Sequence, residues 1–160
     1  PFTGVLYGGL MKTPQGVQVI EFNARFGDPE TEVGLPRLKS DIYEIFSAVA
    51  EERDPGCAEW ADFATLGIVL ASKGYPGSYE KGFEIKGLDQ VDGTVYHMGT
   101  ARKEDRLVTS GGRVMIVVCR GETPAEAREK ALQQVGRIEC DNLFFRCDIG
   151  AKGLSGIEEK

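Results

Sequence analysis

The segment from Val19 to Thr31 constrains the fold of this chain more than any other part of the sequence. It begins as an apolar, strand-forming run, Val19 to Phe22, and it breaks at a Gly-Asp-Pro turn. Alternate side chains of a strand leave the same face, so Glu21 and Asn23 are expected to point together with Cα atoms about 7 Å apart. Phe22 then points the other way, and we expect it to pack into a core behind the strand.

Glu21 and Asn23 present oxygen donors from one face of this strand. Mg²⁺ takes oxygen ligands at about 2.1 Å and commonly shares its coordination sphere with substrate phosphates. The pair therefore suits Mg²⁺ (or Mn²⁺). A solvent-facing polar pair on an amphipathic strand explains the same residues without a metal, and Glu-x-Asn is too short a motif to decide.

Two apolar runs, at 4–11 and 17–22, flank the polar turn at 14–16. Such an arrangement predicts an antiparallel β-hairpin. Beyond the Gly-Asp-Pro turn, a short helix is expected over 31–38, although Pro36 fits a helix interior poorly.

A clearer helix begins at Ser40 or Asp41. Its apolar residues recur at helical spacing along one face: Ile42, Ile45, Phe46, Val49 and Ala50. Charged residues and helix breakers at 51–56 end it. We place the main boundary here, with a first domain over 1–52, a connector over 53–64 and a second domain over 65–160.

The second domain is predicted to consist of short strands and one long helix. Strands are expected at 66–71, 94–98 and 113–120. Thr123 to Glu126 predicts a helix start, because threonine can cap, proline suits the first helical position and the glutamate can bond back. The apolar face of this helix continues through Ala127, Ala131, Val135 and Ile138. The fold class is therefore α+β, with a mostly antiparallel sheet and a helix packed across it.

Composition narrows the possible partners. Nineteen Lys and Arg residues against 25 Asp and Glu residues give a net charge of −6, which disfavours nucleic acid as a partner. The four cysteines form no C-x-x-C pair and have a single histidine beside them, which argues against zinc and for reduced thiols in the cytoplasm. No run approaches the roughly 20 apolar residues of a membrane span. Because the chain opens at Pro1 inside the predicted hairpin, with no leader peptide, we expect a fragment of a larger protein.

Several spaced motifs together resemble one family. They are the segment from Val19 to Thr31, Gly74-Tyr75-Pro76-Gly77, Thr109 to Val114, and Arg146 to Gly150. In this order they are similar to the end of the ATP-grasp domain and the C-terminal domain of the phosphoribosylamine–glycine ligase (glycinamide ribonucleotide synthetase) family. The resemblance covers nearly all 160 residues. It implies that 1–52 is the terminal piece of an ATP-grasp lobe.

The resemblance also implies a reaction. Members of the family join glycine to 5-phosphoribosylamine through a glycyl phosphate while ATP becomes ADP and phosphate, in de novo purine biosynthesis. Glu21 and Asn23 would then hold the metal against the ATP phosphates. Many ATP-grasp enzymes place a further ligand on the preceding strand, but this chain has Tyr7, Gly8 and Gly9 there, so a third ligand is not identified. The nucleotide-gripping loop and lysines of the family lie upstream, so we expect this fragment alone to be inactive and its partner to be the missing N-terminal part.

Three further residues near the predicted metal site are candidates for chemistry. Arg25 shares the face of Glu21 if the strand stays regular, and we predict that it stabilises the transferred phosphoryl group. A salt bridge to Glu21 is the alternative. Asp28 and Glu30 are predicted to accept hydrogen bonds from ribose hydroxyls or the amine of the substrate. A loop that ties itself together, with Asp28 capping the next helix, explains them equally.

Gly111, Gly112 and Arg113 form a second candidate site. Paired glycines let backbone N–H groups converge on an anion, and the arginine adds charge, so the phosphate of phosphoribosylamine would fit. A Gly-Gly hairpin turn between strands at 107–108 and 114–118 is the alternative. His97, the only histidine, is expected to have a structural or rim role.

Two other functions compete with this one. Another ATP-grasp carboxylate–amine ligase would share the Glu-x-Asn strand, but we expect it to lack the continuation over 26–30. A non-catalytic anion-binding module would use the Gly-Gly-Arg loop alone.

Overall fold

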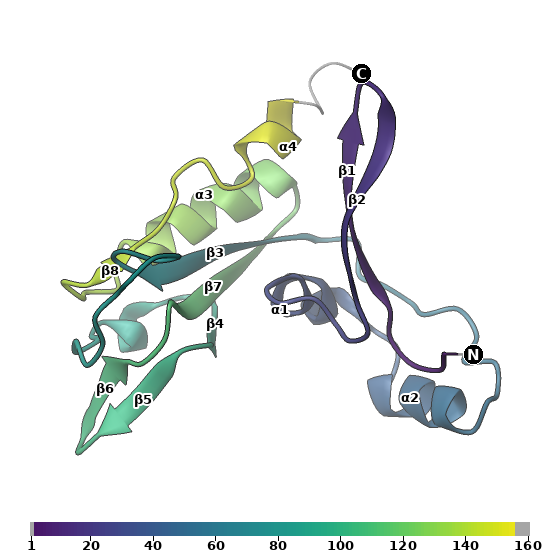
Figure 1. Ribbon diagram of the computed structural model, residues 1–160, viewed down its shortest axis with the longest axis horizontal. Coiled ribbons are helices and arrows are strands. Elements are labelled where there is room, and N and C mark those ends of the chain that lie inside the picture. The colour runs from purple at the N-terminus through teal and green to yellow at the C-terminus, as the bar shows by residue number, and fades with distance from the viewer. Residues whose placement is uncertain (1, 156–160) are drawn as a thin grey trace. The chain divides into compact units, whose positions relative to one another are not determined.

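The computed structural model describes residues 2–155 and contains two compact units, Pro1–Ala61 and Asp62–Lys160 (Figure 1). The boundary between the units falls inside the predicted connector over 53–64. Helices and antiparallel strands are both present, so the predicted α+β class is confirmed. Within the described residues, no helix has the length and apolarity to cross a membrane.

The first unit contains the predicted hairpin. Strand β1 (Tyr7–Thr13) pairs antiparallel with β2 (Gly16–Asn23) in a two-stranded sheet. The Thr13 hydroxyl closes the turn, since it donates to the carbonyl of Gly16 at 2.8 Å and accepts from the amide of Gln15 at 3.2 Å. The hairpin prediction is confirmed.

A β-bulge changes the register of this hairpin. Leu10 lies opposite Val19, whereas Gly9 lies opposite Glu21, so Ile20 is the extra residue. Tyr7 consequently lies opposite Asn23. Residues directly opposite each other share a face of a sheet, so the bulge brings the tyrosine to the face that carries the carboxamide.

The expectation that Phe22 packs into a core is wrong for the described residues. Its side chain is 63% exposed, and several neighbours on both strands are similarly open: Leu10, Met11, Val17, Val19 and Ile20. The physical reason is that β1 and β2 pair only with each other, and a two-stranded ribbon cannot cover its own faces.

Two helical segments follow the hairpin. The predicted helix over 31–38 is divided into α1 (Glu30–Gly34) and the 3₁₀ turn η1 (Leu35–Arg37), which has Pro36 in its first turn. The prediction of the next helix is confirmed as α2 (Ile42–Ala50), whose N-cap is Asp41. The Asp41 carboxylate accepts a hydrogen bond from the amide of Tyr43 at 2.8 Å.

The second unit is built on a four-stranded antiparallel sheet. Its order is β4 (Thr94–His97), β7 (Arg113–Gly121), β3 (Ala64–Ser72) and β8 (Leu143–Phe144). The three predicted strands correspond to β3, β4 and β7. Strands β5 (Thr100–Lys103) and β6 (Arg106–Thr109) form a separate hairpin, after the short 3₁₀ helix η2 (Leu88–Gln90).

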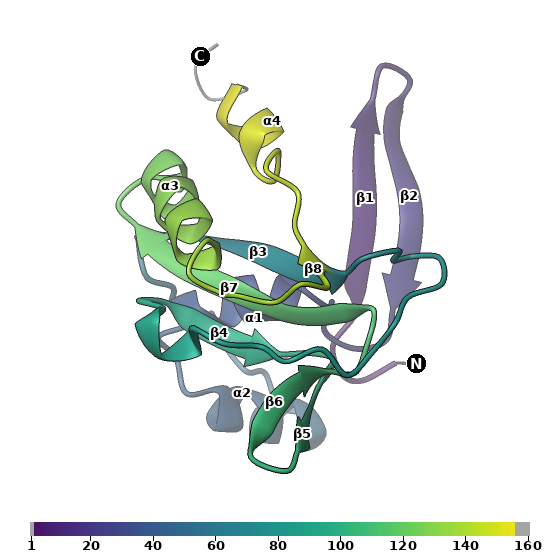
Figure 2. The same cartoon turned by 90° about the vertical axis from the view of Figure 1, so that its left-hand side faces the viewer.

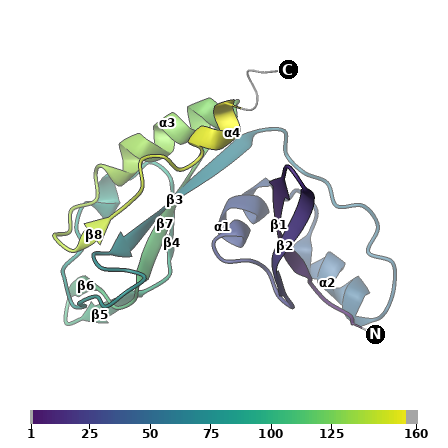
Figure 3. The ribbon, with the colours of Figure 1, turned by 45° about the horizontal axis from the view of Figure 1, so that its top comes forward.

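Helix α3 (Pro124–Val135) lies along β3 and β7 and covers one face of the sheet (Figures 2 and 3). The short helix α4 (Ala151–Ser155) follows later in the chain. The hydrophobic core of this unit contains Ile68, Leu70, Ile85, Val114, Met115, Val117, Cys119, Ala131 and Val135. Burial of this set supplies the main hydrophobic stabilisation of the second unit.

The predicted helix start at Thr123 is confirmed. The Thr123 hydroxyl accepts from the amide of Glu126 at 3.2 Å, and the Glu126 carboxylate accepts from the amide of Glu122 at 2.8 Å. The helix ends at Val135, earlier than expected, and Ile138 packs against the core from the segment beyond it.

Candidate functional site

Glu21 and Asn23 lie together at the end of β2. The Asn23 side-chain amide donates a hydrogen bond to Glu21 Oε1 at 3.1 Å, so both side chains leave the same face of the strand. That bond uses the amide nitrogen and one carboxylate oxygen. The amide oxygen and the second carboxylate oxygen are hard donors of the kind that Mg²⁺ prefers, so the donor set fits the predicted ion.

Gly9, on the neighbouring strand, leaves room for the Glu21 side chain. Gly9 lies opposite Glu21, and a Cβ built on Gly9 would sit 3.2 Å from Glu21 Cγ. A side chain at position 9 would therefore press on the carboxylate arm. Among the described residues, no group of three or more His, Cys, Asp or Glu side chains is placed to hold a metal. A cation on Glu21 and Asn23 would need further ligands from substrate phosphates or water.

Tyr7 is a residue of this site that the sequence reasoning did not single out for a role. Its half-buried side chain lies opposite Asn23 in the register of the hairpin. Burial raises the pKa of Tyr7, and the hydrogen bond to Glu30 and the negative charges of Glu30 and Glu21 raise it further. The tyrosine is therefore neutral at neutral pH, and its hydroxyl can donate a hydrogen bond. The bulge at Ile20 is the feature that places it here.

The turn from Gly27 to Glu30 is held by local hydrogen bonds. The amide of Thr31 donates to the carbonyl of Gly27 at 3.2 Å, and the Thr31 hydroxyl donates to the same carbonyl. Pro29 occupies the N-cap position of α1, so Asp28 does not cap that helix in the predicted way. Asp28 is exposed, and its predicted contact with substrate stays a prediction.

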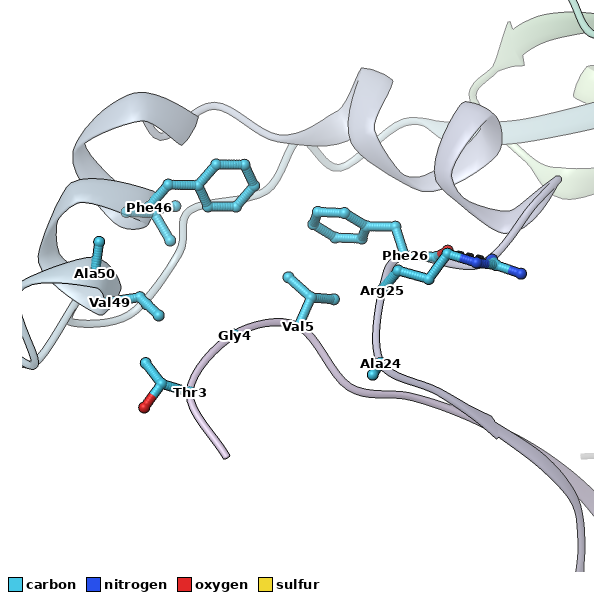
Figure 4. A pocket seen from close by; sticks show the side chains of 10 residues that line it. Thr3, Gly4, Val5, Ala24, Arg25, Phe26, Phe46, Val49 and Ala50 are labelled. Atoms are coloured by element: carbon cyan, nitrogen blue, oxygen red, sulfur yellow. Dashed lines mark hydrogen bonds between the residues drawn. The ribbon is translucent and has the colours of Figure 1, made fainter. Parts of the chain in front are cut away.

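Arg25 lies beyond the end of β2, so a regular strand does not carry it onto the face of Glu21. Its Nη1 donates to the carbonyl of Phe26 at 2.6 Å (Figure 4). The predicted role on a phosphoryl group would require the guanidinium to leave that carbonyl.

An apolar hollow of about 570 Å³ lies beside Arg25 (Figure 4). Its lining comes from the start of the chain, the segment that follows β2 and one side of α2: Thr3, Gly4, Val5, Ala24, Arg25, Phe26, Ile45, Phe46, Val49 and Ala50. The rings of Phe26 and Phe46 are 5.9 Å apart, centroid to centroid. With Arg25 as its sole charged residue, this hollow does not resemble a phosphate site.

The Gly-Gly-Arg loop lies in the second unit and joins β6 to β7. Strand β6 pairs with β5 and not with β7, so the predicted Gly-Gly hairpin turn is wrong. The carbonyls of Gly111 and Gly112 accept hydrogen bonds from Ser72, each at 2.8 Å.

Both glycines pack where a side chain would collide. A Cβ on Gly111 would meet the backbone of Gly99 at 3.0 Å, and a Cβ on Gly112 would meet the ring of Tyr75. Close packing thus accounts for these glycines, while anion binding by the loop stays a prediction. His97 is exposed at the end of β4, with Nδ1 3.0 Å from the Thr100 hydroxyl.

Comparison with protein families identifies this arrangement. The model described as "Phosphoribosylglycinamide synthetase, C domain" matches residues 65–152, and the model of the ATP-grasp (A) domain of the same enzyme matches residues 1–31. The chain belongs to the phosphoribosylglycinamide synthetase family. The predicted resemblance is thereby confirmed, and the Glu21–Asn23 pair lies within the part that matches the ATP-grasp domain.

Individual relatives agree with the family. The chain is 51% identical to a phosphoribosylamine–glycine ligase of Halalkalibacterium halodurans over 96% of its own length and 36% of the relative. It is 43% identical to the trifunctional purine biosynthetic protein adenosine-3 of Gallus gallus, covering 99% of this chain and 16% of that one.

A solved structure is also similar. The crystal structure of phosphoribosylamine–glycine ligase from Thermotoga maritima matches with a TM-score of 0.78 and 35% identity, over 90% of this chain and 36% of that chain. The chain thus spans little more than a third of the length of the ligases it matches.

Proposed function

We propose that this chain is the C-terminal part of an ATP-dependent ligase that joins glycine to 5-phosphoribosylamine in de novo purine biosynthesis, in the cytoplasm. Residues 1–52 would end the ATP-grasp lobe, and 65–160 would be the C-terminal domain. The observation that carries the proposal is the Glu21–Asn23 oxygen pair, which lies at the end of a strand within the part that matches the ATP-grasp domain. Membership in this family argues against another kind of ATP-grasp ligase.

The proposed reaction has two steps. A carboxylate oxygen of glycine attacks the γ-phosphorus of ATP, a P–O bond to the leaving ADP breaks, and glycyl phosphate forms. The amine nitrogen of 5-phosphoribosylamine then attacks the glycyl carbonyl carbon, the C–O bond to phosphate breaks, and the nitrogen loses a proton. Both steps gather negative charge on phosphoryl oxygens, so positioning and charge neutralisation supply most of the catalysis.

Glu21 and Asn23 would hold Mg²⁺ (or Mn²⁺) through their oxygens, and the ion would neutralise charge on the phosphates when bound. Arg25 would stabilise the transferred phosphoryl group after its guanidinium exchanges the carbonyl of Phe26 for phosphate oxygens. Removal of water from the phosphates would fall to parts of the enzyme outside this chain.

The amine substrate would contact two places. Asp28 and Glu30 would accept hydrogen bonds from its ribose hydroxyls or its amine. Gly111, Gly112 and Arg113 would bind its phosphate, with the arginine supplying the charge. Replacing Arg113 with glutamine tests the second contact, because loss of a phosphate contact should raise the KM for phosphoribosylamine and leave the KM for ATP unchanged.

The test of the proposal uses a longer polypeptide, called here the ligase polypeptide. In it, this chain follows the N-terminal segment of a related ligase that this chain does not match. ADP release by that polypeptide is expected to require glycine, 5-phosphoribosylamine and Mg²⁺ together. The chain alone is expected to release no ADP, because it carries no nucleotide-gripping loop of this family. ADP release that is independent of glycine would contradict the proposed reaction, and ligation by the chain alone would contradict its predicted inactivity.

A further inference from the structure

Ser72, the last residue of β3, holds the Gly-Gly-Arg loop through two hydrogen bonds. Its amide donates to the carbonyl of Gly112 at 2.8 Å, and its hydroxyl donates to the carbonyl of Gly111 at 2.8 Å. Ser72 is 0% exposed, so water does not compete for its hydroxyl. The carbonyl of Ser72 accepts a third bond, from the amide of Tyr75 at 3.0 Å. Ser72 therefore joins the end of β3 to two loops.

The two bonds to the Gly-Gly-Arg loop set the direction of two consecutive peptide groups. In a planar trans peptide, the C=O of one residue and the N–H of the next point in opposite directions. Because the carbonyl of Gly111 points to the Ser72 hydroxyl, the N–H of Gly112 points away from Ser72. The bonded carbonyl of Gly112 directs the N–H of Arg113 away from Ser72 in the same manner.

The amide of Gly112 is available to a ligand. Among residues 2–155, none accepts a hydrogen bond from it. An amide that is held in a fixed direction next to an arginine suits the oxygens of a phosphate.

The turn at 74–77 packs against the same loop. A Cβ built on Gly112 would collide with the ring of Tyr75 and would sit 3.1 Å from the ring of Tyr79. The centroids of these two rings are 6.4 Å apart. The rings limit movement of the glycine toward the turn, while Ser72 fixes the peptide groups on either side of the glycine.

We propose that Ser72 is a positioning residue of the substrate site. It holds the Gly-Gly-Arg loop so that the Gly112 amide donates to the phosphate of 5-phosphoribosylamine next to Arg113. Ser72 itself does not touch the substrate. This inference rests on the proposed function, because it assigns the loop to that phosphate.

Kinetics of the ligase polypeptide test the role. Ser72→Ala removes only the hydroxyl, so the carbonyl of Gly111 loses its partner and the peptide group that carries the Gly112 amide is no longer fixed. The KM for 5-phosphoribosylamine should rise about fivefold, as expected for loss of one neutral hydrogen bond. The KM for ATP and kcat should change less than about twofold. Ser72→Cys keeps a weaker donor, so its KM for 5-phosphoribosylamine should lie between the other two values.

Gln134→Ala is the matched control for loss of stability. Gln134 is 6% exposed on α3, and its Oε1 accepts from the amide of Asp92 at 2.8 Å. Like Ser72→Ala, this variant removes a buried side chain that is bonded to the backbone of the second unit. It should lower the melting temperature of this chain at least as much as Ser72→Ala does, and it should leave the KM for 5-phosphoribosylamine unchanged. A comparable rise of that KM in Gln134→Ala would assign the effect to stability and would overturn the role of Ser72.

Titration of this chain with inorganic phosphate, followed by nuclear magnetic resonance, gives a readout that does not depend on activity. In the wild type, phosphate should shift the amide signal of Gly112 and leave that of Gly136, at the end of α3, unchanged. Sodium chloride at the same ionic strength should shift neither signal. Ser72→Ala should require about five times more phosphate for half of the full Gly112 shift.

The outcomes separate the two proposals. An active ligase polypeptide whose KM for 5-phosphoribosylamine is the same in Ser72→Ala overturns the positioning role and leaves the ligase function standing. Equal increases in the KM values for ATP and 5-phosphoribosylamine indicate a structural residue and also overturn the role. A wild-type polypeptide that never ligates glycine overturns the proposed function, and the phosphate titration then decides on Ser72 alone. A Gly112 signal that phosphate does not shift in the wild type overturns the inference, even where Ser72→Ala fails to fold.

Discussion

The β1–β2 hairpin and the β3–β7 strand pair are built from similarly apolar sequences, yet only the second pair is buried. In β3 and β7, Ile68, Leu70 and Val117 are almost inaccessible to solvent. In the hairpin, Val19 and Phe22 are largely exposed. The difference lies in what surrounds each pair, because β7 has a strand on either side and α3 lies across the sheet.

This contrast separates stability from chemistry within one chain. The second unit has a closed core, so its fold should not depend on anything outside the chain. The hairpin has no such core, and it carries the oxygen pair. We expect substitutions in the second unit to change the free energy of unfolding, and substitutions on the polar face of the hairpin to change catalysis.

The largest expected effect is on the free energy of unfolding, and it distinguishes a methionine of the second unit from a methionine of the hairpin. Met115→Ala should lower the free energy of unfolding by about 2–5 kcal/mol, because its side chain is 0% exposed and truncation leaves a cavity. Met11→Ala should change it by less than about 0.5 kcal/mol, because that side chain is 54% exposed. Urea denaturation followed by circular dichroism measures both. Similar losses for the two variants would mean that the hairpin is packed as well as the sheet.

Glu21→Ala should show the opposite behaviour. In the ligase polypeptide it should reduce kcat on the order of a hundredfold or more, because the cation that would neutralise charge on the reacting phosphates loses a ligand. The urea midpoint of this chain should be unchanged. Asn23→Ala should follow in the same direction, and Gln18→Ala, on the same strand opposite Met11, is the control. Turnover near that of the wild type at saturating Mg²⁺ would remove Glu21 from the metal site.

A smaller effect on stability is expected from the N-cap residues of two helices, one in each unit. Thr123→Ala and Asp41→Ala each remove a side chain that accepts a hydrogen bond from a helix N-terminal amide. Each should cost about 1 kcal/mol of local helix stability. Only the Thr123 variant should lower the global unfolding free energy of the second unit, as measured by its urea midpoint. An equal global loss for Asp41→Ala would show that the units unfold together.

The smallest expected effect is the loss of stability at low pH that results from protonation of Glu126. The ammonium of Lys130, followed by the amide of Glu122, holds the pKa of Glu126 below its ordinary range. A carboxylate with a lowered pKa stabilises the fold fully above its ordinary pKa, and this contribution is lost as the pH falls through the lower value. The urea midpoint of Glu126→Gln should therefore lie below that of the wild type at pH 7 and converge with it near pH 2. A gap that persists in acid would assign the effect to helix packing.

Local patterns in the sequence predicted most of the elements. The helical spacing from Ile42 to Ala50 and the Thr123 start signal led to α2 and α3, and the caps at Asp41 and Thr123 are present as hydrogen bonds. Such features depend on residues a few positions apart, which a sequence displays directly. The same holds for the shared face of Glu21 and Asn23.

Features that depend on distant pairing could not be predicted in this way. Counting back from the turn in a regular hairpin would pair Tyr7 with Phe22, whereas the bulge at Ile20 pairs it with Asn23. No residue type indicates that bulge, so the position of Tyr7 opposite Asn23 could not be predicted from the sequence. The pairing of β6 with β5 was missed for the same reason, because Gly111 and Gly112 look like a hairpin turn although they pack against Gly99 and Tyr75.

Native-state hydrogen exchange of this chain tests most directly the claim that the second unit holds the stability and the hairpin holds the site. The backbone amides of β3 and β7 should exchange only through global unfolding, with the slowest signals between Val114 and Cys119. The amides of β1 and β2 should exchange faster by several orders of magnitude at protein concentrations low enough to exclude pairing between copies. Hairpin amides that exchange as slowly as those of β7 in a strictly monomeric sample would contradict the account.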